Sequence, residues 1–342
     1  MYAVPRPHYA KQLSPANRLP TKNLQGWRHA QPNTHACFGS MQNIIDIKNR
    51  IKSIKDTAQI TKAMQLISVS KMRKADEKYE QNDRYYRRIK STIKDIFAHT
   101  STVTHPYLQH RPGNATAYIV IASDAGLAGD YNHRVLSFAE NEIKTVDKYK
   151  IFTVGHIAEE FFVNRNYETD SEFVYCTQNP TIDDVRRLAT TAVDLYDTGE
   201  VDEVRIIYTR HVKGHNIALS TRVVPIEKSD FDDAKSFSDY NEILLFEPSA
   251  SQVFNILVPQ YVLGTIFNAL IESIRCEHSE RMMAMNNATN NANDMIHTLE
   301  LEYHRARQAK ITSELSEMSS YRREQSGQNR KWSRRLWIKP KI

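Results

Sequence analysis

Glycine and proline are missing from two long stretches of this 342-residue chain. Residues 42–105 contain neither, and neither occurs in residues 265–326. Because these two residue types punctuate turns and loops, each stretch is predicted to be one long helix. Six of the ten glycines lie in residues 113–214. The chain is therefore expected to consist of a turn-rich middle between two long helices.

Other absences exclude whole classes of protein. The three cysteines are far apart and form no C-x-x-C or zinc-binding spacing, which favours a reducing compartment and inert thiols. No run of eighteen apolar residues is present, so no direct membrane span is predicted. The thirteen histidines form no H-E-x-x-H pattern. The sequence gives no reason to expect a catalytic site, a metal or a cofactor.

Acidic residues are absent from the first forty residues, which carry five Lys or Arg. Residues 318–342 carry eight Lys or Arg and one Glu, so the intervening chain has a net charge of −6 although the whole has +6. The basic charge thus belongs to the ends, and no nucleic-acid partner is expected for the folded part. Residues 1–40 are predicted to be a mitochondrial transit peptide, with a basic arm as the alternative.

Apolar residues in the first long helix, predicted for residues 41–100, recur in steps of three and four. They begin with Ile44, Ile47, Ile51, Ile54 and Ala58. This spacing is the heptad pattern of a coiled coil. Beyond Ala58 the apolar set is expected to drift to Ile60, Met64 and Ile67, because a helix of 3.6 residues per turn rotates against a 3.5-residue repeat. The helix is expected to continue, with interruptions, to about Phe97.

The second long helix, predicted within residues 249–318, contains the asparagine-rich segment "MAMNNATNNAND" at residues 283–294. Asparagine is a mediocre helix former. Two columns seven residues apart nevertheless form a heptad seam through Met282, Met285, Thr289, Ala292 and Ile296. All five asparagines fall off this seam and are expected to face outward. A shorter helix, "PSASQVFNILV", is predicted to end at Pro259.

Strands and helices alternate in residues 113–246. Strands are predicted at "ATAYIVIAS", "KIFTVG" and "EFVYCT", with helices at residues 129–147, at "HIAEEFFV" and at "TIDDVRRLATTAVDLYD". The segments "EVRIIYTR" and "NIALSTRVVP" are predicted to form a hairpin around "HVKGH". This order predicts a mostly parallel sheet flanked by helices. Because the ends of a domain usually lie close together, the two long helices are expected to pair antiparallel.

The segment "SDAGLAGDYN", at residues 123–132, follows the first predicted strand and opens a helix. Phosphate binds at this place in many α/β proteins. The segment has only Gly126 and Gly129, no lysine and no G-x-G-x-x-G pattern. It is interpreted as a tight structural turn built from Ser123, Asp124, Gly126, Gly129 and Asn132.

Three segments together carry a resemblance to a known family. "IKNRIKSIKDTAQITKAMQLISVSKMRKAD" and "ALIESIRCEHSERMMAMNNATNNANDMIHTLELEYHRARQAKITSELSEM" are similar to the terminal helices of gamma subunits of F-type ATP synthases. "SDAGLAGDYN" resembles that family's S-D-R-G-L-C-G-x-x-N turn. The resemblance covers about residues 41–318. It implies an antiparallel coiled coil of the two long helices joined to a central Rossmann-like α/β domain.

The resemblance also implies a function and partners. The chain would be a non-catalytic rotor shaft that turns inside a ring of alpha and beta subunits. Its foot would contact the ring of c subunits and a small companion subunit, named delta or epsilon. Carried over residue by residue, Lys62, Met64 and Arg281 would lie near an acidic segment of beta. Arg307, Gln308 and Thr312 would meet a second loop of beta.

The sequence departs from the family pattern in several places. Ala125, Ala128 and Asp130 replace Arg, Cys and Gly of the turn, so no role of those residues carries over. A basic segment, residues 319–342, replaces the family's small-residue end. The cysteine-bearing insert of chloroplast members is absent, which favours the matrix side of the mitochondrial inner membrane, as a peripheral subunit. Two alternatives remain open: a nucleotide-binding α/β protein with coiled-coil dimerisation arms, and a freestanding coiled-coil adaptor.

Overall fold

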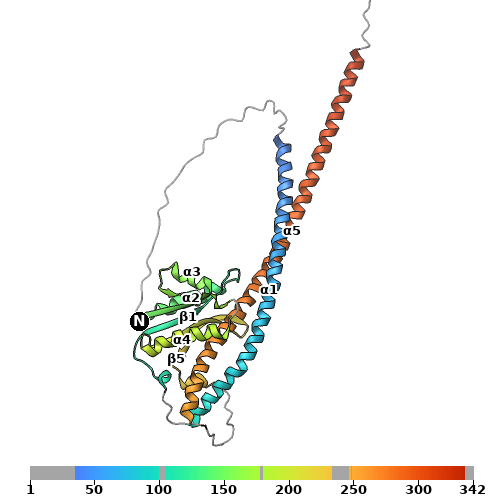
Figure 1. Cartoon of the computed structure of the whole chain (residues 1–342). Coiled ribbons are helices and arrows are strands. Elements are labelled where there is room, and N and C mark those ends of the chain that lie inside the picture. Colours follow the sequence, from blue (N-terminus) through green and yellow to red (C-terminus); the bar gives the residue numbers. More distant parts are fainter. Residues whose placement is uncertain (1–34, 100–104, 178–179, 233–245, 248, 336–342) are drawn as a thin grey trace, which may run out of the picture. The chain divides into compact units, whose positions relative to one another are not determined.

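The computed structural model describes residues 35–99, 105–177, 180–232, 246–247 and 249–335. It contains two long helices, α1 (His35–His99) and α5 (Ala250–Arg335), with a five-stranded α/β domain between them in sequence (Figure 1). The chain divides into two compact units. One is Ile47–Arg305, and the other comprises Met1–Asp46 with Ala306–Ile342. The first unit contains the α/β domain and most of both helices.

The sheet has the strand order β3-β2-β1-β4-β5. Its strands are β1 (Ala115–Ile121), β2 (Lys148–Val154), β3 (Thr169–Asp170), β4 (Glu203–Val212) and β5 (His215–Val224). All neighbouring pairs are parallel except the β4–β5 hairpin. The connecting helices are α2 (Tyr131–Ile143), α3 (His156–Val163) and α4 (Ile182–Thr198), with 3-10 turns η1 (Pro106–Leu108), η2 (Val174–Thr177) and η3 (Lys228–Phe231). The predicted mostly parallel sheet and its closing hairpin are confirmed.

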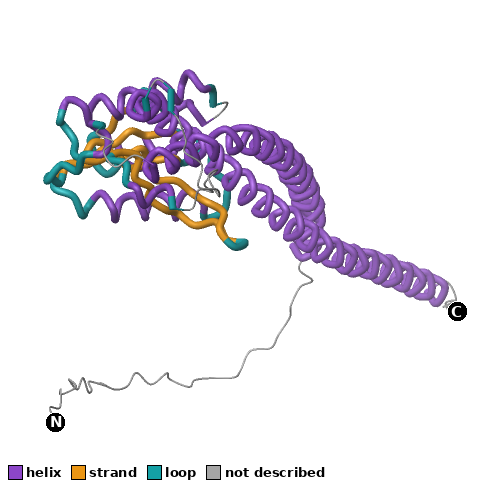
Figure 2. Tube along the Cα trace, turned by 90° about the horizontal axis from the view of Figure 1, so that it is seen from below, coloured by secondary structure: helices purple, strands orange, loops and turns teal. Residues whose placement is uncertain are grey.

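Helices cover both faces of the sheet (Figure 2). On one face, α2 and α3 bury Val135, Leu136 and Phe162 against the strands. On the other face, α1, α4 and α5 build the larger core around Ile119, Phe152 and other strand residues. The even-numbered and odd-numbered residues of β1 therefore enter different cores, as expected for a strand buried on both sides.

Cross-helix bonds show that α1 and α5 run antiparallel. They are Lys55–Glu300 at 2.8 Å, Thr61–Thr289 at 2.8 Å, Gln65–Asn286 at 3.1 Å, Asp76–Arg275 at 2.9 Å, Asn82–Asn268 at 2.6 Å and Tyr86–Thr265 at 3.0 Å. From Lys55 to Tyr86 the bonded positions advance by 31 residues along α1, while their partners go back by 35 residues along α5. The predicted antiparallel coiled coil is confirmed, and both helices can be followed side by side in Figure 1.

The seam of α1 does not drift after Ala58, contrary to the prediction. Ile60 and Ile67 are 61% and 57% exposed, while Thr61 and Ser68 take the seam positions. The heptad spacing persists because both helices supercoil, which holds the seam at 3.5 residues per turn. The Thr61 hydroxyl forms a hydrogen bond with the Thr289 hydroxyl across the seam. The seam is therefore partly polar, and large apolar side chains of α1 remain on the outside.

On α5, the predicted seam is confirmed. Met285 and Ala292 are buried, Met282, Thr289 and Ile296 are half-buried, and all five asparagines of residues 283–294 are exposed. Small seam residues such as Ala288 and Ala292 allow the helices to approach closely. The asparagines therefore form an uncharged polar outer surface and do not interrupt the helix.

The prediction that a helix ends at Pro259 is wrong, because α5 runs through this residue without a break. The ring lies on the exposed side of the helix. Phe254, Val258 and Tyr261, on either side of it, are buried in the large core. A proline inside a helix costs about 3 kcal/mol, and burial of a large apolar side chain returns about 1.5–3 kcal/mol. The packing of the flanking residues therefore outweighs the missing hydrogen bond.

The predicted strand "EFVYCT" is also wrong, because this segment forms η2 and the third strand is the preceding pair Thr169–Asp170. Phe173 is buried and packs its ring 6.3 Å from that of Phe152. The carbonyl of Val174 accepts a hydrogen bond from Gly155. The segment resembles a strand in sequence because it is apolar, but its apolar residues pack against the sheet and do not pair with a neighbouring strand.

Part of α5 between Ala250 and Arg323 has the length and apolarity of a membrane-crossing helix, with a mean hydropathy of 1.5 over eighteen residues. However, 56% of that stretch is buried inside the protein. Its apolar residues, including Ile266 and Leu270, belong to the large core. Packing against the α/β domain and α1 accounts for this composition.

Candidate functional site: the crossing of the long helix and the sheet

The carboxyl ends of the parallel strands are the usual place for a ligand in an open α/β sheet. In this protein α5 lies there. Ser273 of α5 accepts a hydrogen bond from the backbone N–H of Thr209 in β4 at 3.4 Å, and its hydroxyl lies 2.7 Å from that of Tyr131 at the start of α2. Glu272 forms an ion pair with Arg210 at 3.5 Å. The crevice is thus filled by a helix of the same chain.

The turn after β1 is closed by its own side chains. Ser123 donates its hydroxyl hydrogen to the carbonyl of Ala125 at 2.8 Å, and its backbone N–H binds the side-chain oxygen of Asn132 at 3.1 Å. Asn132 donates back to the Ser123 hydroxyl at 2.7 Å. Asp124 accepts a hydrogen bond from the backbone N–H of His156 at 3.2 Å. These bonds support the interpretation of the segment as a structural turn.

Arg281 of α5 fastens this turn to the long helix. Its guanidinium donates to the carbonyl oxygens of Ala125 at 2.7 Å and of Gly126 at 3.2 Å. It also binds the carboxylate of Glu277, one turn earlier on α5, at 2.6 Å. The planar guanidinium fork can bind several acceptors in this way, whereas a lysine ammonium cannot copy the geometry.

The electrostatics around Arg281 follow from burial. Glu277, His278 and Arg281 are only 7–8% exposed. Burial raises the pKa of Glu277, and the neighbouring Arg281 guanidinium partly opposes this change. Burial, together with Arg281 and Lys71, lowers the pKa of His278 to about 4. An Arg281 nitrogen lies 3.2 Å from His278 Nδ1, which must be the unprotonated acceptor because arginine has only donors.

Next to Arg281, Glu280 binds a different part of the domain. Its carboxylate lies 2.6 Å from the guanidinium of Arg134 in α2 and accepts a hydrogen bond from the Asn216 side chain in β5 at 2.9 Å. Arg134 also donates to the Asn216 carbonyl at 2.6 Å. Two adjacent residues of α5 therefore bind three separate segments of the α/β domain.

This arrangement does not suit a phosphate. The carbonyl oxygens of Ala125 and Gly126 point to Arg281, whose donors are already occupied. The carboxylates of Glu277 and Glu280 stand beside the turn and would repel an anion. In the described parts of the chain, no three His, Cys, Asp or Glu side chains are grouped so that they could hold a metal ion. The crevice serves to join the domain to the helix.

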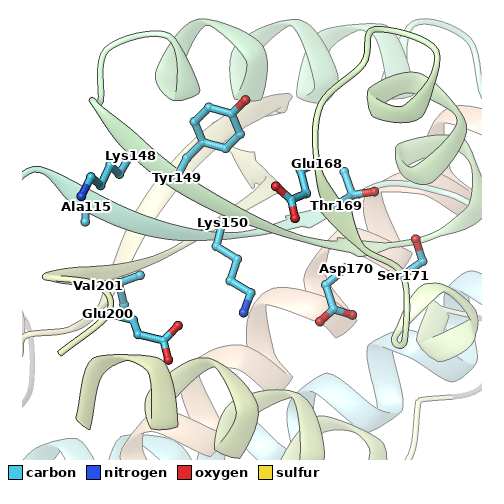
Figure 3. A pocket seen from close by; sticks show the side chains of 10 residues that line it. All are labelled: Ala115, Lys148, Tyr149, Lys150, Glu168, Thr169, Asp170, Ser171, Glu200 and Val201. Atoms are coloured by element: carbon cyan, nitrogen blue, oxygen red, sulfur yellow. The ribbon is translucent and has the colours of Figure 1, made fainter. Parts of the chain in front are cut away.

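A hollow of about 810 Å³ lies at the opposite edge of the sheet. It is lined by residues at the amino ends of β1, β2 and β3 and by Glu200 and Val201 (Figure 3). Lys150 extends into it between the carboxylates of Asp170 and Glu200, and Lys148 and Glu168 also line it (Figure 3). Charges of both signs and a position away from the carboxyl ends give it no resemblance to a nucleotide site.

The buried histidine predicts how stability depends on pH. Because the pKa of His278 is about 4 in the folded chain and about 6.5 when unfolded, its contribution is fully present above pH 6.5. It is lost as the pH falls from 6.5 through 4, by up to about 3 kcal/mol at 1.4 kcal/mol per pKa unit. Denaturant unfolding of the wild type and His278→Gln across this range should give converging stabilities in acid. Parallel curves would contradict the prediction.

The structure locates the residues that the sequence had suggested as partner contacts on α1. Lys62 is exposed and donates to the side chain of Gln65 at 3.0 Å, and Met64 is half-buried beside the seam. Both can present part of their side chains outward. Arg281 cannot, because it is buried and bound within the chain. The expected contact of Arg281 with a partner does not fit this position.

Arg307, Gln308 and Thr312 belong to the later part of α5, in the second compact unit. All three are exposed. Thr312 donates its hydroxyl hydrogen to the Gln308 carbonyl at 2.9 Å, a bond within the helix. The side chains of Arg307 and Gln308 show no hydrogen bond to the described residues. They are therefore available to a partner.

Sequence reasoning missed Ser273, Glu280, Arg134 and Tyr131, which complete the junction. A buried serine and a buried tyrosine on helices carry no distinctive motif. The only signal was the cluster of charged residues in "ESIRCEHSER" at residues 272–281, directly before the apolar "MMAM" segment. The partner carbonyls and amides have no signature in the sequence at all.

Comparisons with known proteins agree with this architecture. The family model described as ATP synthase matches residues 43–320. The ATP synthase gamma chain of Ruminiclostridium cellulolyticum is 40% identical over 289 residues, which cover 81% of this chain and 96% of the relative. That of Alkaliphilus metalliredigens is 38% identical over 279 residues, covering 80% and 96%.

Solved structures share the fold. A chain in the Euglena gracilis mitochondrial ATP synthase, in a structure of OSCP, F1 and c-ring, superposes with a TM-score of 0.54 at 17% identity and covers 84% of this chain and 96% of its own. A chain of the rotor of the same enzyme gives 0.53 at 16% identity, with 79% and 99% covered. The family model and the curated relatives together show that this chain belongs to the ATP synthase gamma chain family.

Proposed function

We propose that this chain is the central rotor shaft of an F-type ATP synthase and that it has no catalytic site of its own. The observation that carries the proposal is the position of α5. It fills the crevice in which an α/β domain would hold a nucleotide, and it binds both sides of that crevice through Ser273, Glu280 and Arg281. These contacts attach the α/β domain firmly to the long helix, as a rotor shaft requires.

The partners follow from the family. The paired helices turn inside the ring of alpha and beta subunits, and the α/β end contacts the c-ring and the delta or epsilon companion subunits. Lys62 and Met64 lie on the part of α1 that faces beta. The exposed apolar residues Ile60, Leu66 and Ile67, at 57–61% exposure, lie on the same stretch and support a contact surface there. Arg307, Gln308 and Thr312 form a second contact with beta on the later part of α5.

The chain is a peripheral subunit of a membrane-bound assembly, and we place it on the matrix side of the mitochondrial inner membrane. The acid-free residues 1–40 support this placement, while the curated relatives compared above are bacterial. The predicted transit peptide lies almost entirely outside the described residues, which begin at His35 within α1. Its removal stays part of the proposal.

Purification of the native assembly tests these proposals together. We expect this chain to co-purify with alpha, beta, c and the companion subunits, and its amino terminus to lie between about Asn23 and Met41. Titration of the isolated chain with ATP should show no saturable binding at millimolar concentration. Saturable binding would favour a nucleotide-binding α/β protein, and a freestanding homo-oligomer without alpha or beta would favour an adaptor.

A further inference from the structure

Glu280 and Arg281 stand where α5 leaves the α/β domain. Before them, α5 packs Phe254, Val258, Ile266 and many other residues into the large core. After them, Asn286 and Thr289 form bonds to α1. The two charged residues are thus at the end of the interface nearest to the freely extending coiled coil. A rotation of the domain about α5 would stretch the bonds that these two residues make to the domain.

The chemistry of the two residues differs from that of the core. Apolar packing is non-directional and tolerates small sliding of one element on another. Hydrogen bonds that involve charged groups are short and depend on geometry. Arg281 binds the turn after β1, whereas Glu280 binds α2 and the start of β5. Because these attachments lie in different segments, they resist rotation about the helix in both directions.

We propose that Glu280 and Arg281 are positioning residues that fix the rotational register of the α/β domain on the coiled coil. The inference rests on the proposed rotor function, because only a rotor needs this register to be maintained under torque. The c-ring drives the α/β end, and the paired helices drive the catalytic ring. A looser register lets the paired helices turn through a larger angle under torque before the α/β domain and the c-ring follow, so that ATP hydrolysis can be completed without a full step of the c-ring.

The experiment compares variants in the complete ATP synthase in sealed membrane vesicles. ATP hydrolysis and ATP-driven proton pumping are measured on the same preparation, and their ratio reports coupling. Arg281→Lys keeps the positive charge beside Glu277 but cannot span both carbonyls. The double variant Glu277→Gln with Arg281→Met removes the attachment without leaving a buried unpaired carboxylate. Each is expected to lower the number of protons pumped per ATP at least twofold.

The matched control is Arg275→Met, six residues and so about 1.7 turns earlier on α5. Arg275 pairs with Asp76 of α1 at 2.9 Å and so joins the two helices to each other and not to the turn. Its variant should keep the wild-type ratio. An unchanged ratio in assembled Arg281→Lys, or an equal fall in Arg275→Met, would overturn the inference.

Glu280→Gln provides a second, milder measurement, because it keeps an acceptor for Asn216 while weakening the pair with Arg134. We expect a smaller fall in the ratio and the same rate of ATP hydrolysis per assembled enzyme. An unchanged ratio here would remove Glu280 from the proposal. Failure of the rotor function itself would look different, because the wild-type vesicles would then pump no protons on addition of ATP.

Discussion

Replacement of Arg307 by alanine is expected to leave the assembly intact and to slow its ATP turnover by roughly ten- to a hundredfold. Arg307 is exposed on α5 and binds no described residue of its own chain. A hydrogen bond to a charged group contributes about 1.5–3 kcal/mol. If the bond to beta forms in only one rotational state, its loss raises the barrier by that amount, at about 1.4 kcal/mol per decade of rate.

The fold should be little affected, because exposed substitutions usually change stability by less than about 0.5 kcal/mol. Arg305→Ala is the matched control. It removes the same charge two positions away, about 200° around the helix. Turnover of the purified complex should therefore fall in Arg307→Ala and Arg307→Lys and stay normal in Arg305→Ala. Loss of assembly in parallel with activity would show that Arg307 is structural instead.

Much of the fold could be predicted because local patterns and tertiary packing agree. The seam residues of α5 recur at heptad spacing from Met282 onward, and they are the residues that face α1. The apolar run at Ala115–Ile121 is buried on both faces, as a central parallel strand requires. Thr181 caps α4 by accepting a hydrogen bond from Asp184 N–H, as its position before two acids indicates.

The errors arose where distant packing decides the outcome. Pro259 is a helix breaker in isolation, but the burial of Phe254 and Tyr261 holds the helix through it. Ile60 and Ile67 read as seam residues because they are apolar, yet they face outward while Thr61 and Ser68 face α5. A seam that is partly polar cannot be distinguished from a solvated face by hydrophobicity alone.

The junction itself could be predicted only in part. The turn residues Ser123 and Asn132 bond to each other over nine positions, which a motif can capture. Arg281 was recognisable as a residue of interest but not as a buried one. Its carbonyl acceptors lie more than 150 positions earlier in the chain, and backbone groups of any residue type could supply them.

Glycine was the sequence feature that located the α/β domain, and substitutions by alanine should separate its different roles. Gly126, predicted to be needed for the turn, has no atom within 4 Å of the place a Cβ would occupy, and its φ is ordinary. Within the same turn, Leu127 takes a positive φ of 62° and Gly129 one of 59°. Gly126→Ala is therefore expected to change the free energy of unfolding by less than about 0.5 kcal/mol.

Gly214 and Gly155 both have positive φ, of 88° and 100°, but differ in their surroundings. At Gly214, in the hairpin, a Cβ would meet nothing within 4 Å. Gly214→Ala should then cost about 1–2 kcal/mol, the conformational penalty alone. At Gly155, a Cβ would lie 2.3 Å from the carbonyl oxygen of Ala122, at the end of β1.

Gly155→Ala is expected to destabilise the chain by more than about 3 kcal/mol, because the conformational strain and the collision add. The collision cannot be relieved cheaply. The Gly155 N–H binds the carbonyl of Val174 at 2.9 Å, and the N–H of Ile157 binds that of Ser123 at 3.1 Å, so the backbone is held on both sides. Denaturant unfolding of the three variants should show the smallest loss of stability for Gly126→Ala, a larger loss for Gly214→Ala and the largest for Gly155→Ala. Equal losses of stability in Gly214→Ala and Gly155→Ala would show that the backbone at the end of β1 can move away from the new methyl group. The close approach of Gly155 to the Ala122 carbonyl would then not be a fixed part of the structure.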